Sequence, residues 1–288
     1  MRRWYDGAAE QLNWDRQRFP GCPSPPDPSV FNTQGVSLRT VGDSQHDLYV
    51  VNHGGREAIE VFRIEATQDE PRIRWIGCVL MPAATPANSV ATYSDGTILA
   101  SVLTHPGTSI TDFVRGDATG GVYQWQPGAA GFHLLPGTRL PGNNGIETSL
   151  DDREFYVIAF GWHAVVVYSR NDTLQPLRNA TAPGFMPDNI HWDGSRLILA
   201  GMQYDEPACG GTRKIIDGKA DDMRCHRGYV VAELDPQSLE FTTIAYAEPN
   251  SAFNGVSAAR IVGNELWLGA YQGDRIAVRP LPGELRRQ

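Results

Sequence analysis

Amide side chains recur along this chain, each placed just before a run of apolar residues. They are Gln34, Asn88, Asn144, Asn189 and Asn254, separated by 54, 56, 45 and 65 residues. Amide oxygens are hard ligands of the kind that calcium prefers. The pattern therefore predicts a ring of oxygen ligands, provided that the fold brings these positions together.

A repeat near fifty residues is typical of β-propeller blades, whose innermost strands start at a central channel. Short runs rich in branched and aromatic residues follow the amides and are separated by Asp-Gly or Gly-Asn turns, which predicts strands and hairpins. The clearest expected strands are 47–53, 98–102, 155–159, 196–200 and 265–270. Apart from a short helix that 8–17 could hold, no segment has a helical period. The chain is predicted to be all-β.

The whole chain, 1–288, is expected to form a single propeller domain, because no low-complexity linker divides the repeats and all-β folds of this length often form one domain. Five full repeats and a partial leading segment predict six blade positions, the first of them incomplete. Residues 1–30 are interpreted as that partial blade or as an N-terminal extension. A polar stretch, 205–228, is interpreted as an inserted loop.

The charge and hydropathy of the chain restrict its partners and leave its compartment open. A net charge of −8 argues against nucleic acid or an anionic membrane as a partner. No apolar run approaches the roughly 20 residues that a membrane helix needs. The first six residues carry charge without an apolar region, so no signal peptide is visible, and a periplasmic or secreted location would require a truncated N-terminus. The oligomeric state is not predicted.

The four cysteines allow several arrangements. Cys209 and Cys225 flank the polar stretch, so a disulfide that closes this loop, free thiols, and a zinc site that includes His226 are the alternatives. Cys22 and Cys78 have no evident partner in the sequence.

The familiar motifs of covalent catalysis and of nucleotide binding are absent. The chain has no Gly-x-Ser-x-Gly elbow, no His-Glu-x-x-His motif and no Walker loop. The glycine-rich segment 116–121 precedes an expected strand and is interpreted as a turn. A metal-centred reaction is therefore favoured over a serine or cysteine nucleophile.

Several segments resemble the paraoxonase/arylesterase family, within the wider group of gluconolactonase-like propellers. The similarity is carried by 47–53 with 59–63, by Asn143-Asn144-Gly145-Ile146, and by Pro187-Asp188-Asn189-Ile190, and it extends from about Phe31 to the C-terminus. The resemblance implies a six-bladed propeller that binds calcium in its channel and hydrolyses lactones and aryl esters of small, rather apolar molecules.

The resemblance also implies roles for individual residues. The calcium ligands would be Asn88, Asn144, Asp188 and Asn189. His53 matches a histidine above the metal that takes part in proton transfer, and His163 matches another pocket histidine after a one-residue gap. The residues make chemical sense, because a weakly neutralised cation polarises a carbonyl while an imidazole takes a proton from water.

Three departures from the family pattern weigh against full activity. Gln34 stands where the family has a histidine, and glutamine can orient water or substrate but cannot accept a proton near neutral pH. Ser89 replaces an aspartate of a second calcium site, and 1–30 contains no counterpart of a glutamate ligand. Two functions thus stay open: a calcium-dependent lactone or ester hydrolase, or a degenerate propeller that acts as a binding or scaffold module.

Overall fold

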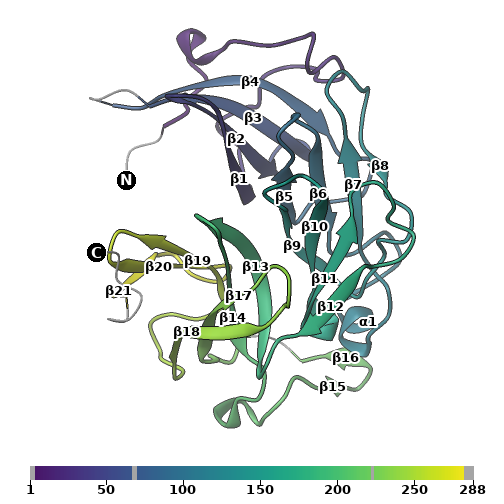
Figure 1. The fold of residues 1–288 in the computed structure, drawn as a ribbon, viewed down its shortest axis with the longest axis vertical. Helices are drawn as coiled ribbons and strands as arrows, with labels where there is room; N and C mark the ends of the chain where they lie inside the picture. The colour runs from purple at the N-terminus through teal and green to yellow at the C-terminus, as the bar shows by residue number, and fades with distance from the viewer. Residues whose placement is uncertain (1–3, 67–69, 222–223, 282–288) are drawn as a thin grey trace.

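The computed structural model of the chain describes residues 4–66, 70–221 and 224–281. It is a β-propeller in which five sheets follow one another around a central channel (Figure 1). The prediction of an all-β propeller is confirmed, but the prediction of six blade positions with an incomplete first blade is wrong. Each recurring amide with the apolar residues after it, here called an amide phrase, lies in or just before the first strand of one sheet, and the first sheet has all four of its strands.

The blades are antiparallel sheets whose strands follow chain order from the channel outward. Blade 1 contains β1 (Thr33–Gly42), β2 (Gln45–Asn52), β3 (Ala58–Glu65) and β4 (Arg72–Leu80). Blade 2 contains β5 (Ser89–Thr92), β6 (Ile98–Val102), β7 (Gly121–Trp125) and β8 (His133–Leu134). Blade 3 contains β9 (Asn143–Thr148), β10 (Glu154–Ala159), β11 (Ala164–Ser169) and β12 (Arg178–Thr181). Blade 4 contains β13 (Phe185–Asp193), β14 (Arg196–Gln203), β17 (Tyr229–Leu234) and β18 (Phe241–Ala247). Blade 5 contains β19 (Val256–Val262), β20 (Glu265–Ala270) and β21 (Ala277–Pro280).

The middle strands are apolar on both faces because each blade packs against two neighbours. In β10, Phe155 and Val157 pack against blade 2, whereas Tyr156 and Ile158, which point to the opposite face, pack against blade 4. This two-sided burial explains why the sequence there is a continuous apolar run rather than an alternating one.

The apolar core consists of successive layers between consecutive blades. Separate clusters join blade 1 to blade 2, blade 2 to blade 3, blade 3 to blade 4, and blade 4 to blade 5. Among the described residues, no apolar cluster joins blade 5 back to blade 1. The ribbon accordingly forms an open ring, with blade 1 and blade 5 on the two sides of the opening (Figure 1).

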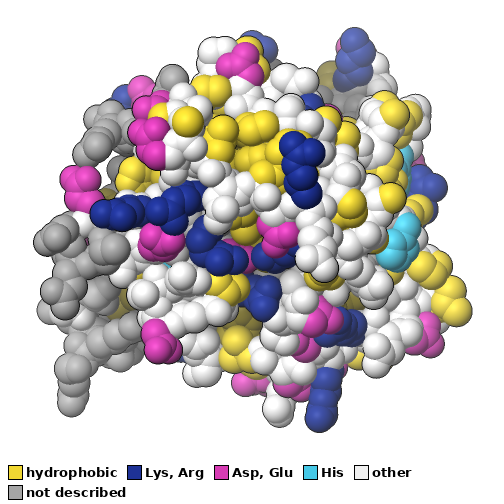
Figure 2. Space-filling model, turned by 90° about the horizontal axis from the view of Figure 1, so that it is seen from above, with side chains coloured by type: hydrophobic (Ala, Val, Ile, Leu, Met, Phe, Trp, Pro, Cys, Tyr) yellow, Lys and Arg dark blue, Asp and Glu magenta, His cyan; other side chains and the backbone are white. Residues whose placement is uncertain are grey.

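The segment before β1 covers blade 1 instead of forming strands of its own. Tyr5 packs on Phe62 with ring centroids 5.1 Å apart, and Trp14 packs on Trp75 at 5.5 Å. Five prolines between 20 and 28 deprive this segment of donors for a strand ladder, which is the physical reason that no partial blade forms. On this side of the molecule, acidic and basic side chains are interspersed around an apolar cluster (Figure 2).

Few elements lie outside the blades. The helix α1 (Ile110–Arg115) follows β6, and the hairpin β15 (Ile215–Ile216) and β16 (Lys219–Ala220) lies between β14 and β17. Single 3-10 turns occur at η1 (Ala9–Gln11), η2 (Phe160–Trp162) and η3 (Pro207–Cys209), so the helix expected at 8–17 is reduced to one turn. No helix in the described ranges is long and apolar enough to cross a membrane.

All four cysteines form disulfides. Cys209 is bonded to Cys225 across the inserted loop, which is one of the three alternatives that the sequence left open. Cys22 is bonded to Cys78, and their Cα atoms are 5.2 Å apart. The sequence showed no partner for these two cysteines, and the structure pairs them with each other. The pairing could not be seen in the sequence because it joins the irregular N-terminal segment to β4, 56 residues away.

Candidate active site at one end of the channel

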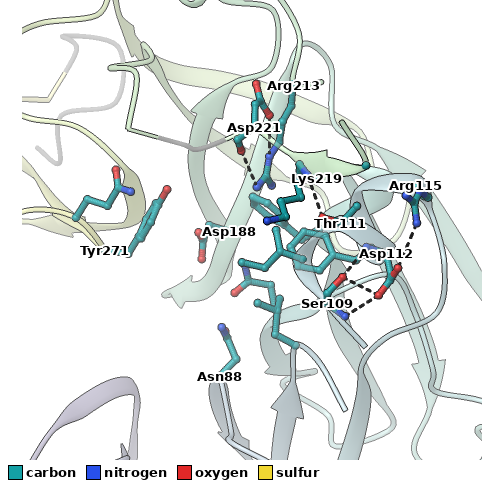
Figure 3. Close-up of a pocket in the computed structure, with 18 of the residues that line it drawn as sticks. Asn88, Ser109, Thr111, Asp112, Arg115, Asp188, Arg213, Lys219, Asp221 and Tyr271 are labelled. Atoms are coloured by element: carbon teal, nitrogen blue, oxygen red, sulfur yellow. Dashed lines mark hydrogen bonds and ion pairs between the residues drawn. The ribbon is translucent and has the colours of Figure 1, made fainter. Parts of the chain in front are cut away.

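A cavity of about 860 Å³ opens at the end of the channel where the amide phrases lie. Its floor is formed by Gln34, Asn88, Asn144 and Asp188, which come from the first four blades. Its walls come from the α1 region, from the β15–β16 hairpin, and from Tyr271 and Gln272 of blade 5 (Figure 3). The structure thus brings together four of the residues that the sequence singled out.

Glycine in the amide phrase allows neighbouring phrases to approach closely. A Cβ added to Gly145 would lie 2.6 Å from the carbonyl oxygen of Asp188 and 2.7 Å from the Cα of Asn189. Gly35 stands in the same relation to Asn88, whose carbonyl oxygen would lie 2.6 Å away. No real Cβ tolerates such distances, so the amide-glycine pairing in the sequence sets how tightly the inner strands surround the channel.

Asp188 is the only carboxylate on the floor of the cavity, and it is buried. Burial raises its pKa to about 7, although a hydrogen bond from Asn144 opposes this shift. The Oδ1 atom of Asn144 is also buried and has no hydrogen-bond partner in the described structure. No cationic side chain of the described residues is paired with Asp188. A desolvated carboxylate beside an orphaned amide oxygen is then an unfavourable arrangement unless a cation or a proton is present.

The other two predicted ligands lie nearby. Asn88 directly precedes β5 and lines the cavity. Asn189 is not part of the lining, and its Nδ2 atom donates to Asp188 Oδ1 and to the carbonyl of Ser257, both at 3.0 Å. Asn254, from the fifth phrase, accepts from the Arg227 amide at 3.1 Å and donates to Gln272 at 3.0 Å, a structural role.

The donor chemistry of this floor fits a hard cation. Carboxylate and amide oxygens are typical calcium ligands, and a calcium ion completes its shell with water or substrate oxygens. Among the residues that the structure describes, no group of three or more His, Cys, Asp or Glu side chains is arranged to hold a metal. One carboxylate with amide oxygens has the donor chemistry of a hard cation and not of a soft metal.

His53 lies beside the cavity and is connected to it through Gln34. Its Nε2 atom is 2.6 Å from Gln34 Oε1, and its Nδ1 atom is 2.7 Å from Glu57 Oε2. Glu57, four residues after His53, was missed in the sequence analysis. A carboxylate that accepts from Nδ1 fixes the tautomer and leaves Nε2 as the reactive nitrogen, provided that the Gln34 amide turns its NH2 group toward it.

His163 lies away from the lining of the cavity. Its ring packs at a tilt against Tyr204, with centroids 4.3 Å apart, and burial together with the positive charge of Arg213 lowers its pKa to about 4. The imidazole is therefore neutral near pH 7. In this position it contacts no floor residue, so its predicted catalytic role stays a prediction.

The upper wall of the cavity was not predicted. The helix α1 begins at Ile110 and is capped by Ser109, which forms a capping box with Asp112. The sequence Ser-x-x-Asp was a signal that could have revealed it. The hairpin supplies Arg213, Lys219 and Asp221 to the same wall (Figure 3). Nothing in the sequence indicated that the polar insertion folds back over the channel.

Comparison with known proteins supports the fold alone. No family model and no curated protein matches the chain. A solved nidogen/laminin complex is 13% identical, covers 88% of this chain and 77% of that chain, and has a TM-score of 0.51. A periplasmic gluconolactonase of Pseudomonas aeruginosa is 17% identical, with 86% and 65% covered and a TM-score of 0.47. A putative 6-phosphogluconolactonase from Bacteroides uniformis is 13% identical, with 90% and 83% covered and a TM-score of 0.48.

Proposed function

We propose that the protein is a calcium-dependent hydrolase of lactones or small esters that acts in the cavity at the end of the channel. One observation carries the proposal: the buried Asp188 and the orphaned Oδ1 atom of Asn144 lie together on the floor of that cavity. The sequence resemblance to the paraoxonase/arylesterase family supports the same reading, and a preference for aryl esters is part of the proposal.

The residues that would hold calcium are Asn88, Asn144, Asp188 and Asn189. When bound, the ion would supply Lewis-acid polarisation of a carbonyl and stabilisation of the developing oxyanion. Leu103, Phe113 and Phe160 form an apolar part of the wall, which favours substrates with an apolar body and excludes water from it.

Proton transfer falls to His53 and Gln34. Gln34 lines the cavity and can hold a water molecule by hydrogen bonds, whereas His53 Nε2 lies directly behind it. If the amide of Gln34 swings aside, the imidazole accepts a proton from the attacking water, and Glu57 holds the ring in place through Nδ1. The Glu57–His53–Gln34 arrangement replaces the pair of histidines that the resemblance implies.

Hydrolysis of a panel of γ- and δ-lactones and phenyl esters tests the proposal. We expect turnover with calcium, loss of turnover with a chelator, and recovery when calcium is restored. Asp188→Ala should abolish the activity, whereas Asp274→Asn, which removes an exposed carboxylate paired with Arg275, should not change it. Turnover that ignores both the chelator and Asp188→Ala would refute the proposed site.

A binding or scaffold module is the second candidate function. It is favoured by the position of His53, because both of its ring nitrogens contact side-chain oxygens and neither is free for a substrate. Calcium binding without turnover on any member of the panel would support this function over the first.

A further inference from the structure

The wall above the candidate site carries cationic groups that the proposed hydrolysis does not use. They belong to the inserted segment, which is anchored firmly. The Cys209–Cys225 disulfide closes it, and the buried Arg227 donates to the carbonyls of Tyr204 and Gly211 at 2.8 and 3.1 Å. At the hairpin, the amide of Ala220 donates to Thr111 Oγ1 at 2.9 Å and joins the insertion to the α1 helix. The disulfide and these hydrogen bonds therefore hold the wall in a defined conformation.

Arg213 is the central cation of this wall. Its side chain is 9% exposed, and its guanidinium carbon lies 5.9 Å from the centroid of the Phe113 ring. Its one ionic partner among the described residues is Asp221, with Nε 3.4 Å from Oδ1, and Nη2 reaches the Asp221 carbonyl only at 3.5 Å. Neither Arg213 Nε nor Asp221 Oδ1 has a hydrogen-bond partner in the described structure. A guanidinium has five donors, so most of its hydrogen-bonding capacity is unused.

Lys219 adds a second positive charge to the same wall. It lies on β16, lines the cavity with Arg213, and has no partner for its ammonium group among the described contacts (Figure 3). Asp221 can neutralise only one of the two cations. Lys219 is exposed, whereas the side chain of Arg213 is largely buried, and leaving the donors of Arg213 unmet costs free energy. An oxyanion that enters the cavity would satisfy these donors by charge-assisted hydrogen bonds.

We propose that Arg213 and Lys219 bind an anionic group, a carboxylate or a phosphate, at the end of the substrate away from its reacting carbonyl. The position of the reacting carbonyl near Asp188 rests on the proposed function, whereas the anion site itself does not. Tyr271 lies across the cavity from the cationic wall, with Asp188 between them (Figure 3). The preferred substrate is then a lactone or ester that carries a negative charge, held with its charged end under the hairpin.

Equilibrium binding tests the anion site independently of hydrolysis. Two unreactive γ-lactams form a matched pair: 2-pyrrolidinone, which is neutral, and pyroglutamate, which adds a carboxylate. By calorimetry we expect pyroglutamate to bind the parent chain on the order of tenfold more tightly, as one charge-assisted hydrogen-bonded pair allows. Inorganic phosphate serves as a competitor, and stronger competition by phosphate than by acetate identifies phosphate as the preferred anion.

Charge-removing variants complete the experiment. Arg213→Gln and Lys219→Gln should each reduce the preference for pyroglutamate, whereas Lys214→Gln, on the same insertion but outside the lining, should keep it. The melting temperature identifies any variant that fails to fold, and the exposed Lys219 keeps the test valid if Arg213→Gln unfolds the insertion. Equal affinity of the parent for both lactams, or a preference that survives both lining variants, would overturn the anion site. Anion binding without hydrolysis of any lactone would overturn the proposed function and leave this site standing.

Discussion

His53 Nε2 and Gln34 Oε1 are 2.6 Å apart, a contact that links the edge of the cavity to an imidazole outside its lining. The contact joins the first amide phrase to the end of β2, where the chain leaves the strand at Asn52. A base in this position reaches the substrate only through Gln34 or after Gln34 moves. The pair therefore decides whether the site can take a proton from water.

The first prediction concerns that pair. In the proposed enzyme, His53→Gln should reduce kcat by about 10²–10⁴-fold, because it removes the general base while keeping a side chain that hydrogen-bonds. Gln34→His should raise kcat by giving the cavity its own imidazole. Steady-state kinetics on the best lactone measures both effects. Unchanged turnover in His53→Gln would remove His53 from the mechanism and direct attention to another base.

The second prediction concerns the metal. Thermal unfolding should shift upward when calcium is added to the parent chain, because a ligand that binds only the folded state stabilises it. Asp188→Ala should abolish the shift, and Asn144→Ala should weaken it, whereas Asp274→Asn should respond like the parent. With one carboxylate, the site should need more calcium than a site with several. An equal shift in Asp188→Ala and in the parent would locate the bound calcium elsewhere.

The third prediction concerns the close approach of inner strands. Gly145→Ala should destabilise the fold by about 1–3 kcal/mol, because the new Cβ would push against the backbone at Asp188 and Asn189. Gly131→Ala is the control, since no heavy atom lies within 4 Å of its added Cβ. Urea denaturation compares the two variants. If the calcium response of Gly145→Ala is lost together with stability, the glycine also shapes the ligand set.

The fourth prediction concerns the disulfides. Replacing Cys22 and Cys78 by serine should lower the free energy of unfolding by about 4 kcal/mol, and replacing Cys209 and Cys225 by about 3 kcal/mol, from the loop lengths that each bond closes. The first pair holds the N-terminal segment on blade 1, so its loss should also increase proteolysis before β1. Equal resistance of the parent and the Cys22/Cys78 variant to protease would contradict this anchoring role.

The fifth prediction concerns pH and His163. Its pKa is about 4 in the folded chain and 6.5 in the unfolded reference, so the unfolded chain binds more protons between these values. The contribution of His163 to stability is therefore complete above pH 6.5 and is lost as the pH falls toward 4. His163→Asn, which tolerates the left-handed backbone at φ 51°, should show a shallower loss of stability in that window. Urea denaturation at pH 4.5, 5.5 and 7 measures the free energy of unfolding of the parent and of His163→Asn. If His163 were not responsible, both proteins would lose the same amount of stability as the pH falls.

Local patterns predicted much of the fold, and long-range packing decided the rest. The amide phrases located all five blades, since each phrase lies in or just before the innermost strand of one blade. The blade count was wrong because 33 residues before Gln34 were treated as part of a blade, although their prolines cannot form a ladder. Asn88, Asn144 and Asp188 line one cavity, and their ligation of calcium is a proposal.

The missed residues share a physical cause. Glu57 contacts His53 because the chain turns between them. Arg213 reaches the cavity because the insertion folds over the channel and is closed by the Cys209–Cys225 disulfide. Neither relation follows from a period or a motif. Both depend on loop conformations that the sequence pattern does not encode at short range.

The open ring has a consequence for how the molecule loses its structure. In a closed propeller every blade has two neighbours, but the described residues of this chain pack as a line of four interfaces with two ends. Such a line should unfold from its ends, as linear repeat arrays do, and not all at once. Blade 1 is protected at its end by the N-terminal segment and the Cys22–Cys78 bond. In the described part of the chain, blade 5 has three strands and exposes Trp267 and Val278, so amide protons of β20 should exchange faster than those of β10 at the middle of the line.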